Sequence, residues 1–90
     1  MVNTDDLILK FDNTTENPLF IVIDPPCIDY KLEPGQSLKL KIVDYKSCED
    51  DVSNIIDVRY STQNIINIDI NYSFRLVVVI DNEEEVIWGG

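Results

Sequence analysis

Apolar and polar residues alternate along much of this chain, as they do in β-strands that bury one face. The alternation is cleanest at Cys27–Leu32 and at Ser37–Ile42, where every second side chain is Ile, Tyr or Leu. Two other segments, Leu19–Ile23 and Leu76–Ile80, are continuously apolar. Such runs are typical of strands buried on both faces, so we predict that these two strands lie at the centre of their sheets.

Weaker segments complete the set of expected strands, and they are Leu7–Phe11, Ile56–Tyr60, Ile66–Tyr72 and Val86–Trp88. Short strands that recur about every ten residues, with no helical periodicity between them, are typical of an antiparallel sandwich or a small barrel. We therefore predict an all-β fold, an antiparallel β-sandwich of about seven to eight short strands. It forms a single domain that spans residues 1–90. A small β-barrel is the alternative.

Turn-forming residues separate the expected strands. Glu33–Gln36 reads Glu-Pro-Gly-Gln, with proline and glycine at the positions that a type II turn requires. We therefore expect Cys27–Leu32 and Ser37–Ile42 to form a hairpin. Asp24–Pro26 ends the strand before it, because proline cannot donate to a sheet ladder. The polar stretch Asp44–Asn54 is predicted to be a long loop.

The composition agrees with strands and makes the chain strongly acidic. Ile and Val dominate the apolar residues and alanine is absent, which favours sheet over helix. Seventeen acidic residues against seven basic ones give a formal charge of -10. This charge repels phosphate groups, so we expect neither nucleic acid nor an anionic membrane as a partner. It attracts basic partners, although acidity that only keeps a small protein soluble is the alternative.

We expect a cytoplasmic protein. Residues 1–6 are polar and acidic, without the basic and apolar regions of a secretory signal. No apolar run approaches the ~20 residues of a membrane-spanning helix. In a reducing compartment Cys27 and Cys48 are expected to be free thiols, and a single disulfide is the alternative for an exported chain.

The sequence carries no recognisable pattern of catalytic chemistry. It has no histidine, so it lacks Ser-His and Cys-His pairs, and its three glycines match no phosphate-binding motif. Paired carboxylates could still act as acid and base. The candidates in or beside strands are Asp24, Asp29, Asp57 and Asp69. Most of them fall on the polar phase of their strands, so we expect solvated surface carboxylates, no enzyme, no metal site and no cofactor.

One segment resembles a loose group of small bacterial proteins of unknown function. The resemblance rests on an apolar strand followed by the acid-Pro pair Asp24-Pro25, and on a Tyr-x-Leu-x-Pro-Gly segment at Tyr30–Gly35. The group also tends to end in a short strand that carries Trp, as Glu85–Trp88 does here. It commonly has an aromatic residue and a glycine after the acid-Pro pair, where this chain has Pro26-Cys27. The resemblance implies a compact β-sandwich and does not indicate an activity.

Partner binding is the function that the sequence favours. Two acidic clusters, Glu49–Asp51 and Glu83–Glu85, are expected in loops, where a sandwich presents its recognition surfaces. We predict a non-enzymatic protein-interaction module, such as an acidic inhibitor or immunity-type protein that captures a basic partner. The expected partner-binding residues are Tyr45, Glu49, Asp50, Asp51, Glu83, Glu84 and Glu85.

Other interpretations remain open at this point. The acidic clusters could supply oxygen ligands in a small-ligand or Ca²⁺-dependent binding domain, although neither has EF-hand spacing. An uncharacterised structural domain is a further alternative. Trp88 could be an aromatic anchor, but it shares a strand face with Val86, so we expect it in the core. The Asn-rich strand around Ile66–Asn71 would suit an edge contact, so we expect a monomer or a weak homodimer.

Overall fold

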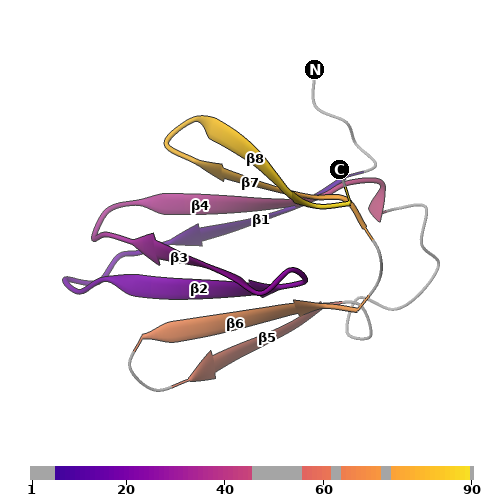
Figure 1. Ribbon diagram of the computed structural model, residues 1–90. Helices are drawn as coiled ribbons and strands as arrows, with labels where there is room; N and C mark the ends of the chain where they lie inside the picture. Colours follow the sequence, from indigo (N-terminus) through magenta and orange to yellow (C-terminus); the bar gives the residue numbers. More distant parts are fainter. Residues whose placement is uncertain (1–5, 46–55, 62–63, 72–73, 90) are drawn as a thin grey trace.

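The part of the chain that the structure describes forms eight strands in two sheets (Figure 1). The structure is a computed structural model, and it describes residues 6–45, 56–61, 64–71 and 74–89. The strands are β1 (Leu7–Asp12), β2 (Leu19–Asp24), β3 (Ile28–Leu32), β4 (Ser37–Ile42), β5 (Ile56–Ser61), β6 (Ile65–Ile70), β7 (Leu76–Ile80) and β8 (Glu83–Trp88). These residues contain no helix and no closed barrel, which confirms the all-β sandwich.

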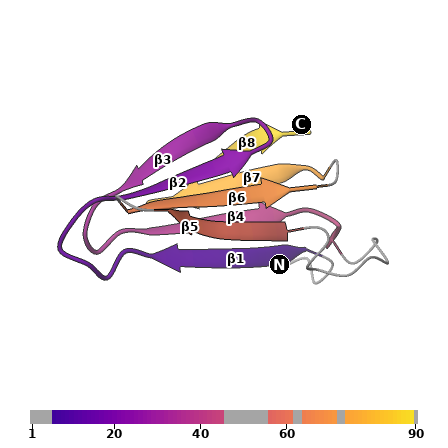
Figure 2. The same ribbon diagram turned by 90° about the horizontal axis from the view of Figure 1, so that it is seen from below.

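The strands are divided equally between the two sheets. Sheet A has the order β1-β4-β7-β8, and sheet B has the order β3-β2-β6-β5. All pairings are antiparallel except that of β2 with β6, which is parallel. The continuously apolar strands β2 and β7 each have a neighbour on both sides, which confirms their predicted central positions. The Asn-rich strand β6 also has a neighbour on both sides, β2 and β5, so the prediction that it suits an edge contact is wrong. Figure 2 shows the edge strands β3 and β8 on one side of the sandwich and β1 on the other.

The core lies between the sheets and consists of aliphatic side chains from their facing surfaces. Its buried members are Ile21, Ile23, Leu32, Leu38, Leu40, Ile42, Ile68, Ile70, Leu76 and Val78. Most of them are alternate residues of their strands, as the sequence pattern predicts. Burial of each such side chain stabilises the fold by about 1.5–3 kcal/mol before the loss of chain entropy is counted.

The expected hairpin between β3 and β4 does not form, although its turn does. The Gln36 amide donates to the Glu33 carbonyl at 3.0 Å, and Gly35 has a φ of 86°. The turn carries the chain from sheet B to sheet A, because β3 pairs with β2 whereas β4 pairs with β1 and β7. Leu32 and Leu38 are therefore buried on opposite walls of one core. Alternation shows which face of a strand is buried and does not show which strand lies beside it.

A buried asparagine holds the corner where the chain passes from β1 to β2. Asn13 is 2% exposed. Its amide nitrogen donates to the carbonyl oxygens of Asn17 at 2.8 Å and Leu32 at 2.9 Å. Its amide oxygen accepts hydrogen bonds from the Thr15 backbone at 3.0 Å and the Thr15 hydroxyl at 2.7 Å. Because its backbone also bonds to the β3–β4 turn, Asn13 joins two crossings between the sheets.

The acidic segment Glu83–Glu85 is the first half of β8, so the prediction that it lies in a loop is wrong. Asp81 and Asn82 have φ values of 53° and 64°. These left-handed conformations are the ones that a two-residue hairpin turn requires. Because the turn contains only two residues, strand pairing with β7 begins directly after it, and Glu83 lies opposite Ile80. Turn geometry and the strongly β-forming partner strand β7 outweigh the weak strand preference of glutamate.

The prediction that Trp88 belongs to the core is also wrong. Val86 and Trp88 are 43% and 40% exposed. Ile87 packs against the core instead. The register of β8 shifts opposite Leu76 and Val77, which marks a bulge at this end of the strand.

Candidate functional site

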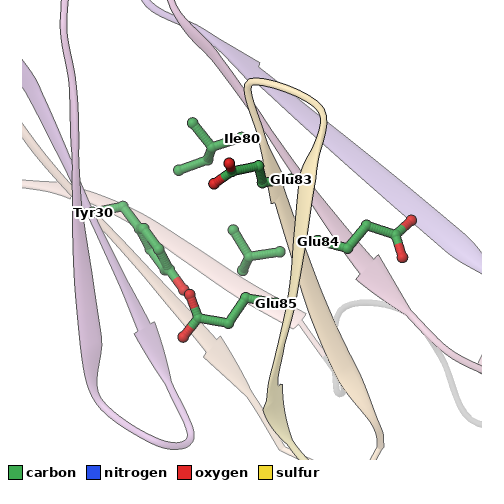
Figure 3. A pocket seen from close by; sticks show the side chains of 6 residues that line it. Tyr30, Ile80, Glu83, Glu84 and Glu85 are labelled. Carbon is green, nitrogen blue, oxygen red and sulfur yellow. The ribbon is translucent and has the colours of Figure 1, made fainter.

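An acidic hollow opens between the edge strands β3 and β8. Its volume is about 280 Å³, and its lining residues are Tyr30, Val78, Ile80, Glu83, Glu84 and Glu85. Figure 3 shows Glu83 and Glu85 on the side of β8 that faces Tyr30, whereas Glu84 points away. This division follows from the alternation of side chains along a strand. The hollow therefore has apolar residues of β7 as one part of its wall and two carboxylates beside them.

The acidic charge of β8 is not neutralised by any ion pair in the part of the chain that the structure describes. None of the ion pairs found there involves Glu83–Glu85, and all of these residues are exposed. The other edge strands differ from β8. Lys10 of β1, Lys31 of β3 and Arg59 of β5 each pair with a carboxylate. Among the four edges, β8 thus carries charge of a single sign.

The phenol of Tyr30 gives the hollow a buried polar group. Its hydroxyl makes no hydrogen bond of normal geometry with the described residues, but the Glu85 carboxylate points toward it and interacts with it (Figure 3). Burial raises the pKa of Tyr30 above its ordinary value of 10.0, and the negative charge of Glu85 raises this pKa further. At neutral pH the hydroxyl is therefore protonated. It can donate a hydrogen bond to a carboxylate or accept one from a cationic group.

The second half of β8 carries exposed apolar side chains. Val86 and Trp88 form part of a second, shallower hollow of about 430 Å³ that also includes Arg75 and Gly89. Gly89 has a φ of 71°, and a Cβ on it would lie 3.0 Å from the backbone of Arg75. A side chain at this position would therefore be strained, which favours glycine. β8 thus offers three glutamates followed by exposed valine and tryptophan side chains along one strand.

The structure brings together only part of the predicted partner-binding set. Glu83–Glu85 lie together on β8, whereas Glu49–Asp51 lie outside the described residues. Tyr45 packs against Phe74, with ring centroids 6.1 Å apart, and it contacts the core. It follows β4 at the end of sheet A that is opposite to Glu83. Tyr45 therefore does not contribute to the acidic hollow.

The pattern-based analysis missed Tyr30 as a member of the site. Tyr30 lies on the apolar phase of its strand and so is expected to be an ordinary core residue. The available signal was its polar tip, because a buried tyrosine hydroxyl normally has a hydrogen-bond partner. Its proximity to Glu85 depends on how the two sheets pack, which no local pattern reveals.

The carboxylates considered as an acid–base pair lie on the outer surface of sheet B. Asp24, Asp69 and Asp57 form a row across β2, β6 and β5, because Asp69 lies opposite each of the others. Arg59 pairs with Asp69 at 2.5 Å. Asp29 is exposed on β3. Within the described ranges no group of three or more potential metal-ligating side chains is gathered at one place.

Two further features concern cysteine and the membrane. Cys27 is an exposed free thiol in the turn between β2 and β3, and Cys48 lies outside the described residues. No helix in the described part of the chain has the length and apolar character needed to cross a bilayer.

Comparison with known proteins finds no relative: no family model, curated protein or solved structure matches this chain. The chemistry of the hollow and of β8 is therefore the basis for a functional interpretation.

Proposed function

We propose that this protein is a non-enzymatic interaction module that captures a basic protein or peptide. Its binding surface is the acidic edge, which we define as Glu83–Glu85 of β8 together with Tyr30 of β3. The observation that carries the proposal is the charge of β8. An edge strand presents three glutamates, of which Glu83 and Glu85 face an open hollow, and no described basic residue forms an ion pair with them.

This surface favours a cationic partner for two physical reasons. The chain's formal charge of -10 attracts a basic molecule from a distance and accelerates encounter. At the surface itself, Glu83 and Glu85 accept charge-assisted hydrogen bonds, which are stronger than bonds between neutral groups. Trp88 and Val86 supply exposed apolar area next to these charges, and tryptophan is among the residues that most often anchor interfaces.

An inhibitor or immunity-type protein is the specific role that we propose for such a surface. An acidic protein that covers the basic surface of its partner also blocks the access of anionic substrates to that surface. We place this activity in the cytoplasm, in a protein that is a monomer or a weak homodimer. The same charge disfavours nucleic acids and anionic membranes as partners, and the proposed role requires no cofactor.

A pair of charge-matched variants tests the proposal. Glu83→Gln with Glu85→Gln removes both hollow-facing charges, and Asp24→Asn with Asp57→Asn removes two charges from the outer face of sheet B. Both variants change the formal charge from -10 to -8, because two acidic residues are neutralised in each. Binding of a fluorescent lysine-rich peptide is measured by anisotropy at low and at physiological salt.

We expect the Glu83/Glu85 variant to lose about tenfold in affinity and the Asp24/Asp57 variant to lose less than about threefold. Affinity of the unmodified protein should fall as salt rises, because salt screens exposed charges. Equal losses in the two variants would show that net charge alone, and not the acidic edge, attracts the peptide.

A further inference from the structure

The unpaired edge of β8 suggests how a basic partner is held. In the described residues β8 pairs with β7 alone, so one side of its backbone is unpaired. Such an edge is a template for another strand, and proteins use it to bind extended peptides. The pairing of β8 with β7 is regular from Glu83 to Val86, and the bulge lies beyond Val86. Four consecutive residues therefore present a regular edge.

We infer that the partner binds as an extended segment that adds to β8 as a strand, with basic residues at alternate positions. This inference rests on the proposed function and specifies its partner. Charge distinguishes β8 from the other edges, since β1, β3 and β5 each carry a basic residue paired with a carboxylate. It also disfavours a second copy at this edge, because like charges opposite one another destabilise strand pairing.

The alternation of side chains sets the position of each partner residue. Residues opposite Glu83 and Glu85 point into the hollow, where their charges meet the two carboxylates. The residue between them lies opposite Glu84 on the outer side. The next outward position lies opposite Val86, which lines one hollow together with the exposed Trp88, so it suits an apolar side chain. An antiparallel partner thus has the pattern apolar–basic–any–basic.

The walls of the hollow fit long basic side chains. The aliphatic part of a lysine or arginine can pack on Val78 and Ile80, while its charged end reaches Glu83 or Glu85. The Tyr30 hydroxyl, which lies beside the Glu85 carboxylate, can also accept a hydrogen bond from that charged end.

The backbone of β8 offers a further distinction between strand addition and simple charge attraction. In an antiparallel ladder alternate residues bond to the partner strand, and the pair that flanks a two-residue turn is a bonded pair. Ile80 and Glu83 are that pair, so the outward backbone groups belong to Glu84 and Val86. A partner strand would bond to them through the residues that lie opposite.

Four synthetic peptides with identical net charge test the inference by calorimetry with the unmodified protein. The first has the alternating core Val-Lys-Thr-Lys between neutral caps, and the second has the same residues with the lysines adjacent. The third carries an N-methyl group on the threonine amide, which strand addition would direct at Glu84. The fourth carries the N-methyl group on the lysine that would lie opposite Glu83. In strand addition the backbone amide of this lysine would point to solvent, so its methylation should not disturb binding.

We expect the first and fourth peptides to bind with affinities within about threefold of each other. The second and third should be about tenfold weaker, since they lose alternation or backbone hydrogen bonds. Equal, salt-sensitive affinity for all four peptides would overturn strand addition and leave electrostatic capture intact. If no peptide binds even at low salt, both proposals fail. If the protein dimerises and the dimer does not bind the first peptide, a second copy occupies the edge of β8. This result would also overturn the inference.

Discussion

At the scale of single residues, two polar side chains tie together the turns at one end of the sandwich. Asn13 uses both atoms of its buried amide to bond the β1–β2 corner and the end of β3. The Gln36 side chain accepts a hydrogen bond from the Glu33 amide at 2.8 Å and donates to Asp81 at 3.1 Å. The β3–β4 turn is thereby linked to the β7–β8 turn. Polar side chains thus hold connections that aliphatic packing does not reach.

Replacement of Asn13 should be among the most destabilising polar substitutions in this protein. Asn13→Ala removes the donor for the buried Leu32 carbonyl, and an unsatisfied buried group costs about 1–3 kcal/mol. Urea denaturation measures the change in the free energy of unfolding. Asn17→Ala is the control, because the Asn17 side chain is exposed and Asn17 takes part in the hydrogen bonds of this corner through its backbone. A change below about 0.5 kcal/mol in Asn13→Ala, the usual size for a surface substitution, would contradict this role.

Tyr30 should titrate at a pH above its ordinary pKa of 10.0 in the folded protein. Its pKa lies above 10.0 because of burial and the Glu85 charge. A pKa raised by folding contributes stability that is complete below pH 10.0 and is lost as pH rises through the higher, folded-state value. Ultraviolet absorbance during an alkaline titration measures the ionisation of the tyrosines, and the component that is lost in Tyr30→Phe belongs to Tyr30. Glu85→Gln should move the pKa of Tyr30 back toward its ordinary value, and an unchanged titration in that variant would exclude the electrostatic contribution.

At the scale of elements, the strands themselves could be predicted and their neighbours could not. Alternation located β3 and β4, and continuous apolar runs identified the central strands β2 and β7. The hairpin expected at Pro34-Gly35 failed because a type II turn can also carry the chain between sheets. The parallel pairing of β2 with β6 depends on packing between distant segments, and no local pattern encodes it.

The candidate site was predicted less completely than the fold. Charge alone identified Glu83–Glu85, since a run of acidic residues is visible in the sequence. The placement of these glutamates on a strand depends on two turn residues in the left-handed conformation, Asp81 and Asn82. Polar composition alone does not distinguish such a tight turn from a longer loop. Tyr30 joins the site only through the packing of one sheet on the other.

The β7–β8 hairpin should be sensitive to the residue at its second turn position. Asn82 has a φ of 64°, a conformation that costs most L-residues roughly 1–2 kcal/mol. We expect Asn82→Ala to lower the free energy of unfolding by about 1 kcal/mol, and Asn82→Gly to leave it unchanged or raise it. Thermal denaturation of both variants provides the measurement. If alanine is tolerated as well as glycine, the two-residue turn does not determine where β8 begins.

At the scale of the whole molecule, excess negative charge opposes the compact state. The formal charge is -10, and the ion pairs of the described residues are mostly exposed. Exposed ion pairs contribute little, about 0–1 kcal/mol each. Self-repulsion among the carboxylates is therefore the electrostatic effect that we expect to dominate folding.

Salt should consequently act on stability and on binding in opposite directions. At about 0.15 M salt, where the screening length is ~8 Å, carboxylate repulsion is weaker than at low salt, so the melting temperature should be higher. Affinity for a basic peptide should fall over the same range, because that attraction is screened too. Calorimetric melting and peptide binding in the same buffers measure both trends. A melting temperature that decreases with salt would mean that ion pairs outweigh repulsion.

The order of strands in the two sheets has a consequence for how the protein is made. Each sheet joins a pair from the first half of the chain to a pair from the second half, through the contacts of β4 with β7 and of β2 with β6. When synthesis has reached only β4, the inner strands of both sheets still lack a neighbour and expose aliphatic edges. A nascent chain therefore completes neither sheet until β6 and β7 have emerged from the ribosome, and it depends on that second half to cover edges that would otherwise aggregate.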